Sequence, residues 1–228
     1  MSIVLHLIRQ TVVRCLRARA VVRCLRSQGG LALMEFALVL PVLLLLGLTG
    51  IEFANWTVTK MQVSQLALQL ADNASRMGTA ASGGKIVYEA NIKETFAGAQ
   101  LQSGSLDLNA KGRAFVSSLE PAAVASSTPT DYTIRWQRCY GALRSQRSRY
   151  GVQGDQKTTG MGPAGQLVKP LPKGATMFVE IYYPYVPLFT SAMVPSTFFD
   201  ETASMVVRDQ RVIGQAPTAT PGLAAATC

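Results

Sequence analysis

Residues 31–51 read LALMEFALVLPVLLLLGLTGI, with Glu35 as the one ionisable side chain among them. An α-helix rises about 1.5 Å per residue, so this segment gives a helix roughly 31 Å long, which matches the hydrocarbon core of a bilayer. A cleaved signal peptide also carries basic and then apolar residues, but its apolar region is shorter and a small-x-small cleavage site follows it. The sequence therefore favours a membrane anchor.

The charges beside the apolar segment indicate its orientation. Residues 1–30 contain six arginines and no acidic side chain. Because basic residues next to an apolar span stay on the cytoplasmic side, the larger C-terminal part is expected outside the cytoplasm. The predicted organisation is a basic cytoplasmic leader at 1–30, a transmembrane helix at 31–55 and an extracytoplasmic domain at 56–228.

A helical pattern continues beyond the membrane segment. Apolar side chains recur at helical spacing and would form one buried stripe, at Val63, Leu66, Leu70, Ala74 and Met77. Gly78 and the small residues after it favour an end to the helix. We therefore expect one helix over about 31–77 that is apolar all round at first and amphipathic later. Pro41 lacks an amide hydrogen and is expected to kink this helix.

The remaining sequence predicts a mixed domain. Residues 85–101, KIVYEANIKETFAGAQL, favour a short amphipathic helix, although the first of them also suit a strand. Alternating β-branched and aromatic residues predict four strands, at 113–119, 132–140, 177–185 and 203–213. In the second strand, Tyr132, Ile134 and Trp136 are expected on one face. The fold class is α+β, in which a long membrane-spanning helix continues into an amphipathic half that packs on a small antiparallel β-sheet.

The sequence gives little support for an enzyme. The single histidine, His6, lies in the leader, which leaves the extracytoplasmic part without a histidine base or metal ligand. Gly160, Gly162 and Gly165 match the dinucleotide-binding pattern G-x-G-x-x-G, but no apolar strand precedes them and Pro163 interrupts them. They belong to a predicted loop at 146–173. We expect no catalytic residue, metal site or cofactor.

The four cysteines divide between two compartments. Cys15 and Cys24 lie in the leader, where thiols stay reduced, whereas Cys139 and Cys228 lie beyond the span, in a space that oxidises thiols. A bridge between the second pair would close a loop of roughly 90 residues and stabilise the fold by about 4–5 kcal/mol on a chain-entropy model. Two free thiols or bridges to other subunits are the alternatives.

The start of the span resembles a known family. Basic residues are followed by Gly30, four further residues, Glu35, Phe36 and an apolar helix, and the run EFALVLP at 35–41 is the most specific part. The segment 29–56 is similar to the TadE/TadG-like minor pseudopilins of tight-adherence (Tad, or Flp) pilus systems. A looser similarity covers residues 176–189 and 205–211.

The resemblance implies a processing site and an assembly residue. A prepilin peptidase would cut between Gly30 and Leu31, and Glu35 would then meet the new amino group of a neighbouring subunit. The four-residue spacing places the amine and the carboxylate one helical turn apart on one face. Pairing would satisfy two charges that are costly in hydrocarbon. The alternative is that Glu35, near the cytoplasmic edge, extends to the lipid headgroups.

The resemblance also implies a function, partners and a location. The chain would be a minor pseudopilin needed to assemble a Tad/Flp type IV pilus used in surface adhesion. Its partners would be the bacterial inner membrane, other pilins and pseudopilins, the Tad inner-membrane assembly platform and the prepilin peptidase. It would be a single-pass protein with a cytoplasmic N-terminus and a periplasmic C-terminal domain, or a component of the surface pilus.

A basic stretch leaves a second function open. Arg144, Arg147 and Arg149 lie in a predicted loop close to Tyr140 and Tyr150. A solvated loop is the first interpretation, contact with anionic surface polymers the second and capture of extracellular DNA the third, so nucleic acid is not an expected partner. The alternative function is therefore an uncleaved, membrane-anchored envelope protein whose basic loop binds anionic polymers or DNA.

Overall fold

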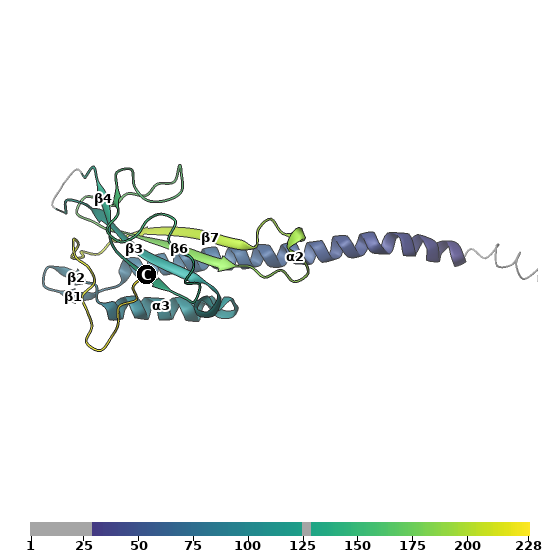
Figure 1. Ribbon diagram of the computed structural model, residues 1–228, viewed down its shortest axis with the longest axis horizontal. Helices are drawn as coiled ribbons and strands as arrows, with labels where there is room; N and C mark the ends of the chain where they lie inside the picture. The colour runs from purple at the N-terminus through teal and green to yellow at the C-terminus, as the bar shows by residue number, and fades with distance from the viewer. Residues whose placement is uncertain (1–28, 125–128) are drawn as a thin grey trace, which may run out of the picture. The chain divides into compact units, whose positions relative to one another are not determined.

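The structure is a computed structural model that describes residues 29–124 and 129–228 (Figure 1). Most of the predicted leader, including Cys15 and Cys24, lies outside the described residues. The described chain divides after Ile51 into two units, and the second unit runs from Glu52 to Cys228. The limits of the three predicted segments, at residues 30 and 55, stay predictions.

One helix, α2 (Gly29–Arg76), contains the whole apolar segment and the predicted amphipathic stretch. It includes an 18-residue window with a mean hydropathy of 2.3 and is long and apolar enough to cross a membrane. Pro41 lies inside the helix, and the predicted kink stays a prediction. The helix ends before Gly78, whose φ of 122° is a conformation that glycine adopts without the steric cost of a side chain.

A five-stranded antiparallel sheet forms the centre of the second unit, in the order β5-β4-β3-β6-β7. A hairpin of β1 (Thr79–Ala81) and β2 (Gly84–Ile86) and a short helix, α3 (Glu89–Ser103), precede it. The remaining elements are η1 (Gly104–Leu106), α4 (Leu108–Lys111), β3 (Arg113–Pro121), β4 (Tyr132–Tyr140), β5 (Gln156–Lys157), β6 (Thr176–Pro184), η2 (Ser191–Met193) and β7 (Phe198–Val206). The predicted α+β class is confirmed.

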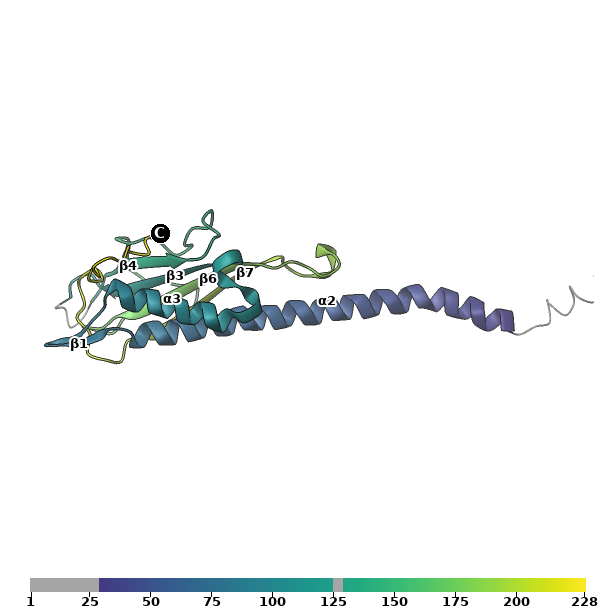
Figure 2. The ribbon, with the colours of Figure 1, turned by 90° about the horizontal axis from the view of Figure 1, so that it is seen from below.

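The second half of α2 and helix α3 lie together on one face of the sheet (Figure 2). The predicted stripe of α2 is buried in this layer, since all five of its side chains are at most 8% exposed. Ile92 and Phe96 of α3 and Val116 and Val179 of the sheet belong to the same cluster. Burial of a valine, leucine or methionine side chain contributes about 1.5–3 kcal/mol, so the stripe is a principal contact between helix and sheet.

A bulge in β4 changes which face its side chains occupy. Ser118 pairs with Trp136 but the next residue, Leu119, pairs with Ile134, which leaves Arg135 unpaired. Trp136 belongs to the cluster on the helix side, whereas Ile134 belongs to a second cluster on the other face. The expectation that Tyr132, Ile134 and Trp136 share one face is therefore wrong for Trp136, because an extra residue inverts the alternation.

The last strand differs from its predicted range. Residues 203–213 were expected to be extended, but β7 begins at Phe198 and ends at Val206. The residues that follow turn toward the end of α2, where Arg211 donates hydrogen bonds from Nη2 to the carbonyl groups of Ser75 at 3.0 Å and Met77 at 2.6 Å. Carbonyl groups at a helix C-terminus lack partners within the helix, so Arg211 caps α2 and cannot also continue the strand.

The predicted loop at 146–173 contains the short strand β5 and an antiparallel bridge between Met161 and Val168. Met161 is 1% exposed and packs on the cluster that contains Ile134 and Phe178. The loop therefore covers the face of the sheet opposite the helices. Residues 85–101 were expected to form a helix whose first residues also suit a strand. The structure contains both, since strand β2 ends at Ile86 and helix α3 begins at Glu89.

Candidate functional site

The first turns of α2 carry the residues predicted for processing and assembly. Gly30 and Leu31 lie in the helix, and Glu35 lies one turn after Leu31. The Glu35 side chain is exposed and makes no hydrogen bond or ion pair with any residue that the structure describes. A carboxylate in this position needs a partner beyond the described residues or contact with water, because it is surrounded by apolar residues.

The surface around Glu35 is apolar and uncovered. The large side chains from Leu33 to Leu46 are between 37% and 74% exposed, and no residue from 32 to 51 is buried. A soluble protein rarely exposes a continuous apolar surface of this size, so lipid or other helices must cover it. Glu35 therefore lies within a continuous exposed apolar surface.

A second acidic residue, Glu52, lies directly after the apolar segment and is fully buried. Its carboxyl group accepts hydrogen bonds from the Tyr185 hydroxyl at 2.7 Å and from the Phe189 backbone amide at 2.8 Å. Asn55, one turn further along α2, donates to the same hydroxyl at 2.8 Å. Buried polar groups need such partners, so the network fixes α2 against the segment that follows β6.

Trp56 adds a second attachment between α2 and this segment. Its indole Nε1 donates to the Ser196 carbonyl at 2.7 Å, and its ring meets Phe199 edge to face with the centroids 5.5 Å apart. The Phe53 ring stacks on that of Trp56 with the centroids 5.8 Å apart. Together with Glu52 and Asn55, Trp56 forms what we call the exit clamp, which holds the β6–β7 loop at the start of the second unit.

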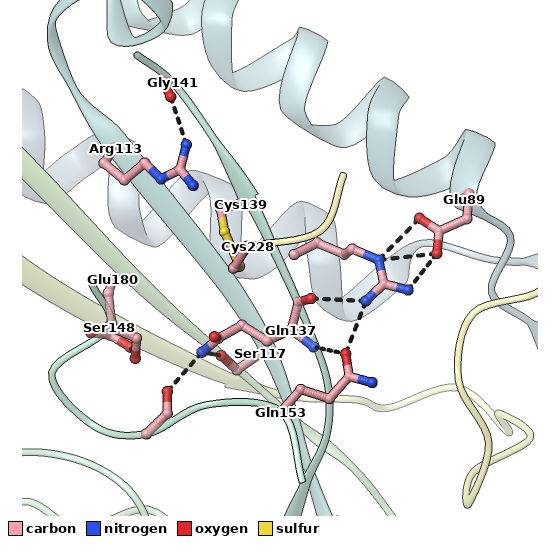
Figure 3. The surroundings of a disulfide bond; sticks show 12 residues. Glu89, Arg113, Ser117, Gln137, Cys139, Gly141, Ser148, Gln153, Glu180 and Cys228 are labelled. Atoms are coloured by element: carbon pink, nitrogen blue, oxygen red, sulfur yellow. Dashed lines mark hydrogen bonds and ion pairs between the residues drawn. A yellow bond between two sulfur atoms is a disulfide. The ribbon is translucent and has the colours of Figure 1, made fainter. Parts of the chain in front are cut away.

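The disulfide region contains a buried ion pair (Figure 3). Cys139 of β4 is joined to Cys228, with their Cα atoms 5.3 Å apart. On the helix side of β4, Arg138 Nε donates to both carboxyl oxygens of Glu89 at 3.0 and 3.1 Å, and the two side chains are only 7% and 5% exposed. Such a pair orients α3 on the sheet, and loss of one partner typically costs about 3–5 kcal/mol.

The structure separates the three arginines of the predicted basic loop. Arg149 pairs with Asp200 at 2.6 Å, whereas Arg144 and Arg147 pair with no carboxylate among the described residues. These two line a hollow of 330 Å³ beside the disulfide, together with Arg113. Burial, and then the charge of Arg144, lower the pKa of Arg113. The hollow therefore has the size and charge to hold an anionic group, and Arg149 does not belong to it.

Two further carboxyl groups are buried in the sheet region, where burial raises the pKa of both. Glu180 of β6 accepts hydrogen bonds from the Tyr182 hydroxyl at 2.7 Å and the Arg149 amide at 2.9 Å, which oppose the rise. Glu120 of β3 lies 3.4 Å from Arg135 and accepts a bond from the Gly214 amide. Both carboxyl groups tie loops to the sheet.

Acidic, histidine and cysteine side chains are scattered in the part of the chain that the structure describes. Among residues 29–124 and 129–228, no group of three acidic, histidine or cysteine side chains is arranged to hold a metal ion. Gly160, Gly162 and Gly165 lie in turns around the bridge of Met161 to Val168, and no helix follows them. These glycines allow a tight loop and do not introduce a phosphate-binding helix.

Sequence reasoning did not identify Glu52 as a site residue, although a signal was present. The buried stripe at Val63, Leu66 and Leu70, extended backward in helical steps, passes through Thr59 and Trp56 to Glu52. A carboxyl group on a stripe that faces the core requires a buried donor. The donor, Tyr185, follows the predicted third strand, and its distance of 133 residues from Glu52 along the chain concealed the pairing.

A comparison with protein families matches residues 30–72 to the TadE-like protein family. The match covers the Gly30 site, Glu35, the exit clamp residues of α2 and most of the buried stripe. It confirms the family resemblance of the helix, and TadE-like proteins are associated with Tad pili. No curated protein and no solved structure matches the chain.

Proposed function

Because residues 30–72 are TadE-like, we propose that the chain is a minor pseudopilin needed for assembly of a Tad (Flp) type IV pilus used in surface adhesion. The observation that carries the proposal is Glu35. It is the one ionisable side chain of the apolar segment 31–51, it has no partner among the described residues, and it follows Leu31 by one helical turn.

The proposed mechanism begins with cleavage between Gly30 and Leu31 by a prepilin peptidase. Cleavage leaves an ammonium group on Leu31 within an apolar surface, where an unpaired charge is costly. Glu35 of a neighbouring pilin or pseudopilin accepts this charge, and the apolar surfaces of the two helices cover each other. The same pairing sets the axial position of one subunit relative to the next, because the Leu31 amine and the neighbouring Glu35 meet at only one axial offset of the two helices.

The location and partners follow from this mechanism. The leader stays in the cytoplasm because of its arginines, the apolar part of α2 crosses the inner membrane, and the second unit folds in the periplasm. The chain then meets the Tad inner-membrane assembly platform and other pilins while it is still in the membrane. The folded second unit supplies contacts outside the membrane and takes no part in catalysis.

The first test is the N-terminus of the mature protein, measured by mass spectrometry on membranes from cells with and without their prepilin peptidase. The proposal expects Leu31 as the first residue only where the peptidase is present. A Gly30→Val variant, which blocks the cut at the same bond, is expected to stay full-length in both. A chain that keeps Gly30 in peptidase-positive cells would contradict the processing step.

The second test separates the charge of Glu35 from its size. Glu35→Gln keeps the shape of the side chain and removes the charge, and it is expected to abolish pili while the protein stays in the membrane. Phe36→Leu is the control, because it changes an adjacent exposed residue without altering charge. Normal piliation with Glu35→Gln, measured by electron microscopy and by sheared pilus protein, would refute the role of Glu35.

The basic hollow supports a second candidate function, an uncleaved anchored protein that binds anionic polymers. Its supporting observation is that Arg144 and Arg147 lack carboxylate partners among the described residues and border the same hollow. The double variant Arg144→Gln with Arg147→Gln is expected to lose retention on a sulfated polysaccharide column. Arg149→Gln is the matched control, because Asp200 already neutralises Arg149. Equal retention of both variants would exclude the hollow as the binding site.

A further inference from the structure

The loop between β6 and β7, residues 185–197, exposes a cluster of large apolar side chains. Val186 is 78% exposed, Leu188 58% and Phe189 50%. No charged residue occurs from Ile181 to Phe199, although the domain as a whole is basic. In α3, by contrast, Leu101 is the one large apolar side chain that is exposed. A concentrated, uncharged cluster requires an explanation that isolated residues do not.

The exit clamp holds this loop at one height along α2. The Phe189 amide donates to Glu52, and the Ser196 carbonyl accepts from Trp56, so the loop is attached to the helix at two points. Both views show the loop extending beyond the sheet beside α2 (Figures 1 and 2). The loop is therefore fixed at the level of Glu52.

The height of Glu52 determines what the loop meets. Glu52 is the residue directly after the apolar segment 31–51, and each residue advances a helix by about 1.5 Å. When residues 31–51 span a bilayer, Glu52 and the loop bonded to it lie where hydrocarbon gives way to headgroups. This is the depth at which proteins place tryptophan side chains, and Trp56 lies one helical turn after Glu52.

We propose that residues 186–189 of the β6–β7 loop insert into the outer surface of the same bilayer that α2 spans. Lipid is the occupant that fits, because the loop is bonded to Glu52, the residue that directly follows the membrane segment, and because burial of the cluster in lipid would remove no charge from water. The buried Glu52 keeps its carboxyl group out of this apolar contact by turning it toward Tyr185 and the Phe189 amide. The proposal depends on the membrane position of residues 31–51 and not on the pilus function.

The test uses the full-length protein in liposomes, with Cys15 and Cys24 changed to serine and the disulfide left intact. A single cysteine is introduced by Leu188→Cys and labelled with an environment-sensitive fluorophore. Leu101→Cys is the matched control, since Leu101 is an 83% exposed leucine on α3, a different element. Quenching is measured with a nitroxide attached to the lipid chains near the headgroup and with aqueous iodide.

The proposal expects the label at position 188 to lose its fluorescence to the lipid nitroxide and to resist iodide, and the label at 101 to show the reverse. A Val186→Cys label is expected to behave as the one at 188, which guards against a local effect of either substitution. Iodide quenching at 188 without lipid quenching would overturn the proposal. Protection at 188 that disappears when the protein is diluted in lipid would also overturn it, because a second copy would then be the cover.

Discussion

The two halves of α2 belong to one helix but have opposite surroundings. From residue 32 to residue 51 no side chain is buried, whereas from Glu52 to Arg76 a continuous stripe is covered by the sheet and α3. The change occurs within one residue, between the exposed Ile51 and the fully buried Glu52. The first half therefore obtains its stability from lipid or from other helices, and the second half obtains it from its own domain.

This difference predicts that equal substitutions have unequal effects along the same helix. Leu70 is fully buried, so Leu70→Ala is expected to lower the free energy of unfolding of the second unit by about 2–5 kcal/mol through lost burial and a cavity. Chemical denaturation of the protein in detergent, followed by near-ultraviolet circular dichroism, measures the change.

Two control leucines isolate the cause of that effect. Leu68 lies two residues away and is 52% exposed, and Leu43 lies in the membrane half and is 55% exposed. Leu68→Ala and Leu43→Ala are each expected to change the unfolding free energy of the second unit by less than about 0.5 kcal/mol. A large effect of Leu43→Ala would mean that the two halves are not independent.

The extent of this helix was predictable because its signals are local. The apolar run, the stripe from Val63 to Met77 and the glycine at 78 are each recognisable within a few turns, and the observed end at Arg76 is close to the expected one. Strand β4 was predicted with its observed bounds, since alternating aromatic and β-branched residues are also a local pattern. Long-range hydrogen bonds were not required to locate either element.

The features that sequence reasoning missed all depend on partners far along the chain. The bulge at Arg135 is visible only in the pairing of β4 with β3. Arg211 lies in an expected strand but bonds instead to the end of α2. In the candidate site, Glu35 was recognisable from its spacing to Gly30, whereas Glu52 required knowledge of Tyr185 and Phe189. The separation of Arg149 from Arg144 and Arg147 required knowledge of Asp200.

A smaller effect is expected at the boundary between the halves. Glu52→Gln replaces one of the two accepting oxygens with an NH2 donor, which then faces either the Tyr185 hydroxyl or the Phe189 amide. The substitution is therefore expected to cost about 1–3 kcal/mol and to loosen the β6–β7 loop. Limited proteolysis within residues 185–197 should become faster, and the unfolding midpoint should fall. Glu94→Gln is the control, because Glu94 is exposed on α3. An unchanged rate of cleavage in the loop would contradict the role of the exit clamp.

The smallest expected effect concerns pH and lies on the far side of the sheet from α2. Burial raises the pKa of Glu180 above its ordinary value of 4.5, so the folded protein binds a proton there more tightly than the unfolded chain does. Stability attributed to this group is therefore fully present below 4.5 and is lost as the pH rises through the raised pKa. Glu180→Gln should flatten the fall in unfolding midpoint over this range, measured in detergent at a series of pH values.

Burial raises the pKa of Glu120 as well, so some slope should persist, and Glu94→Gln should leave the whole profile unchanged. An unaltered slope with Glu180→Gln would mean that its hydrogen bonds from Tyr182 and the Arg149 amide offset the cost of burying the charge.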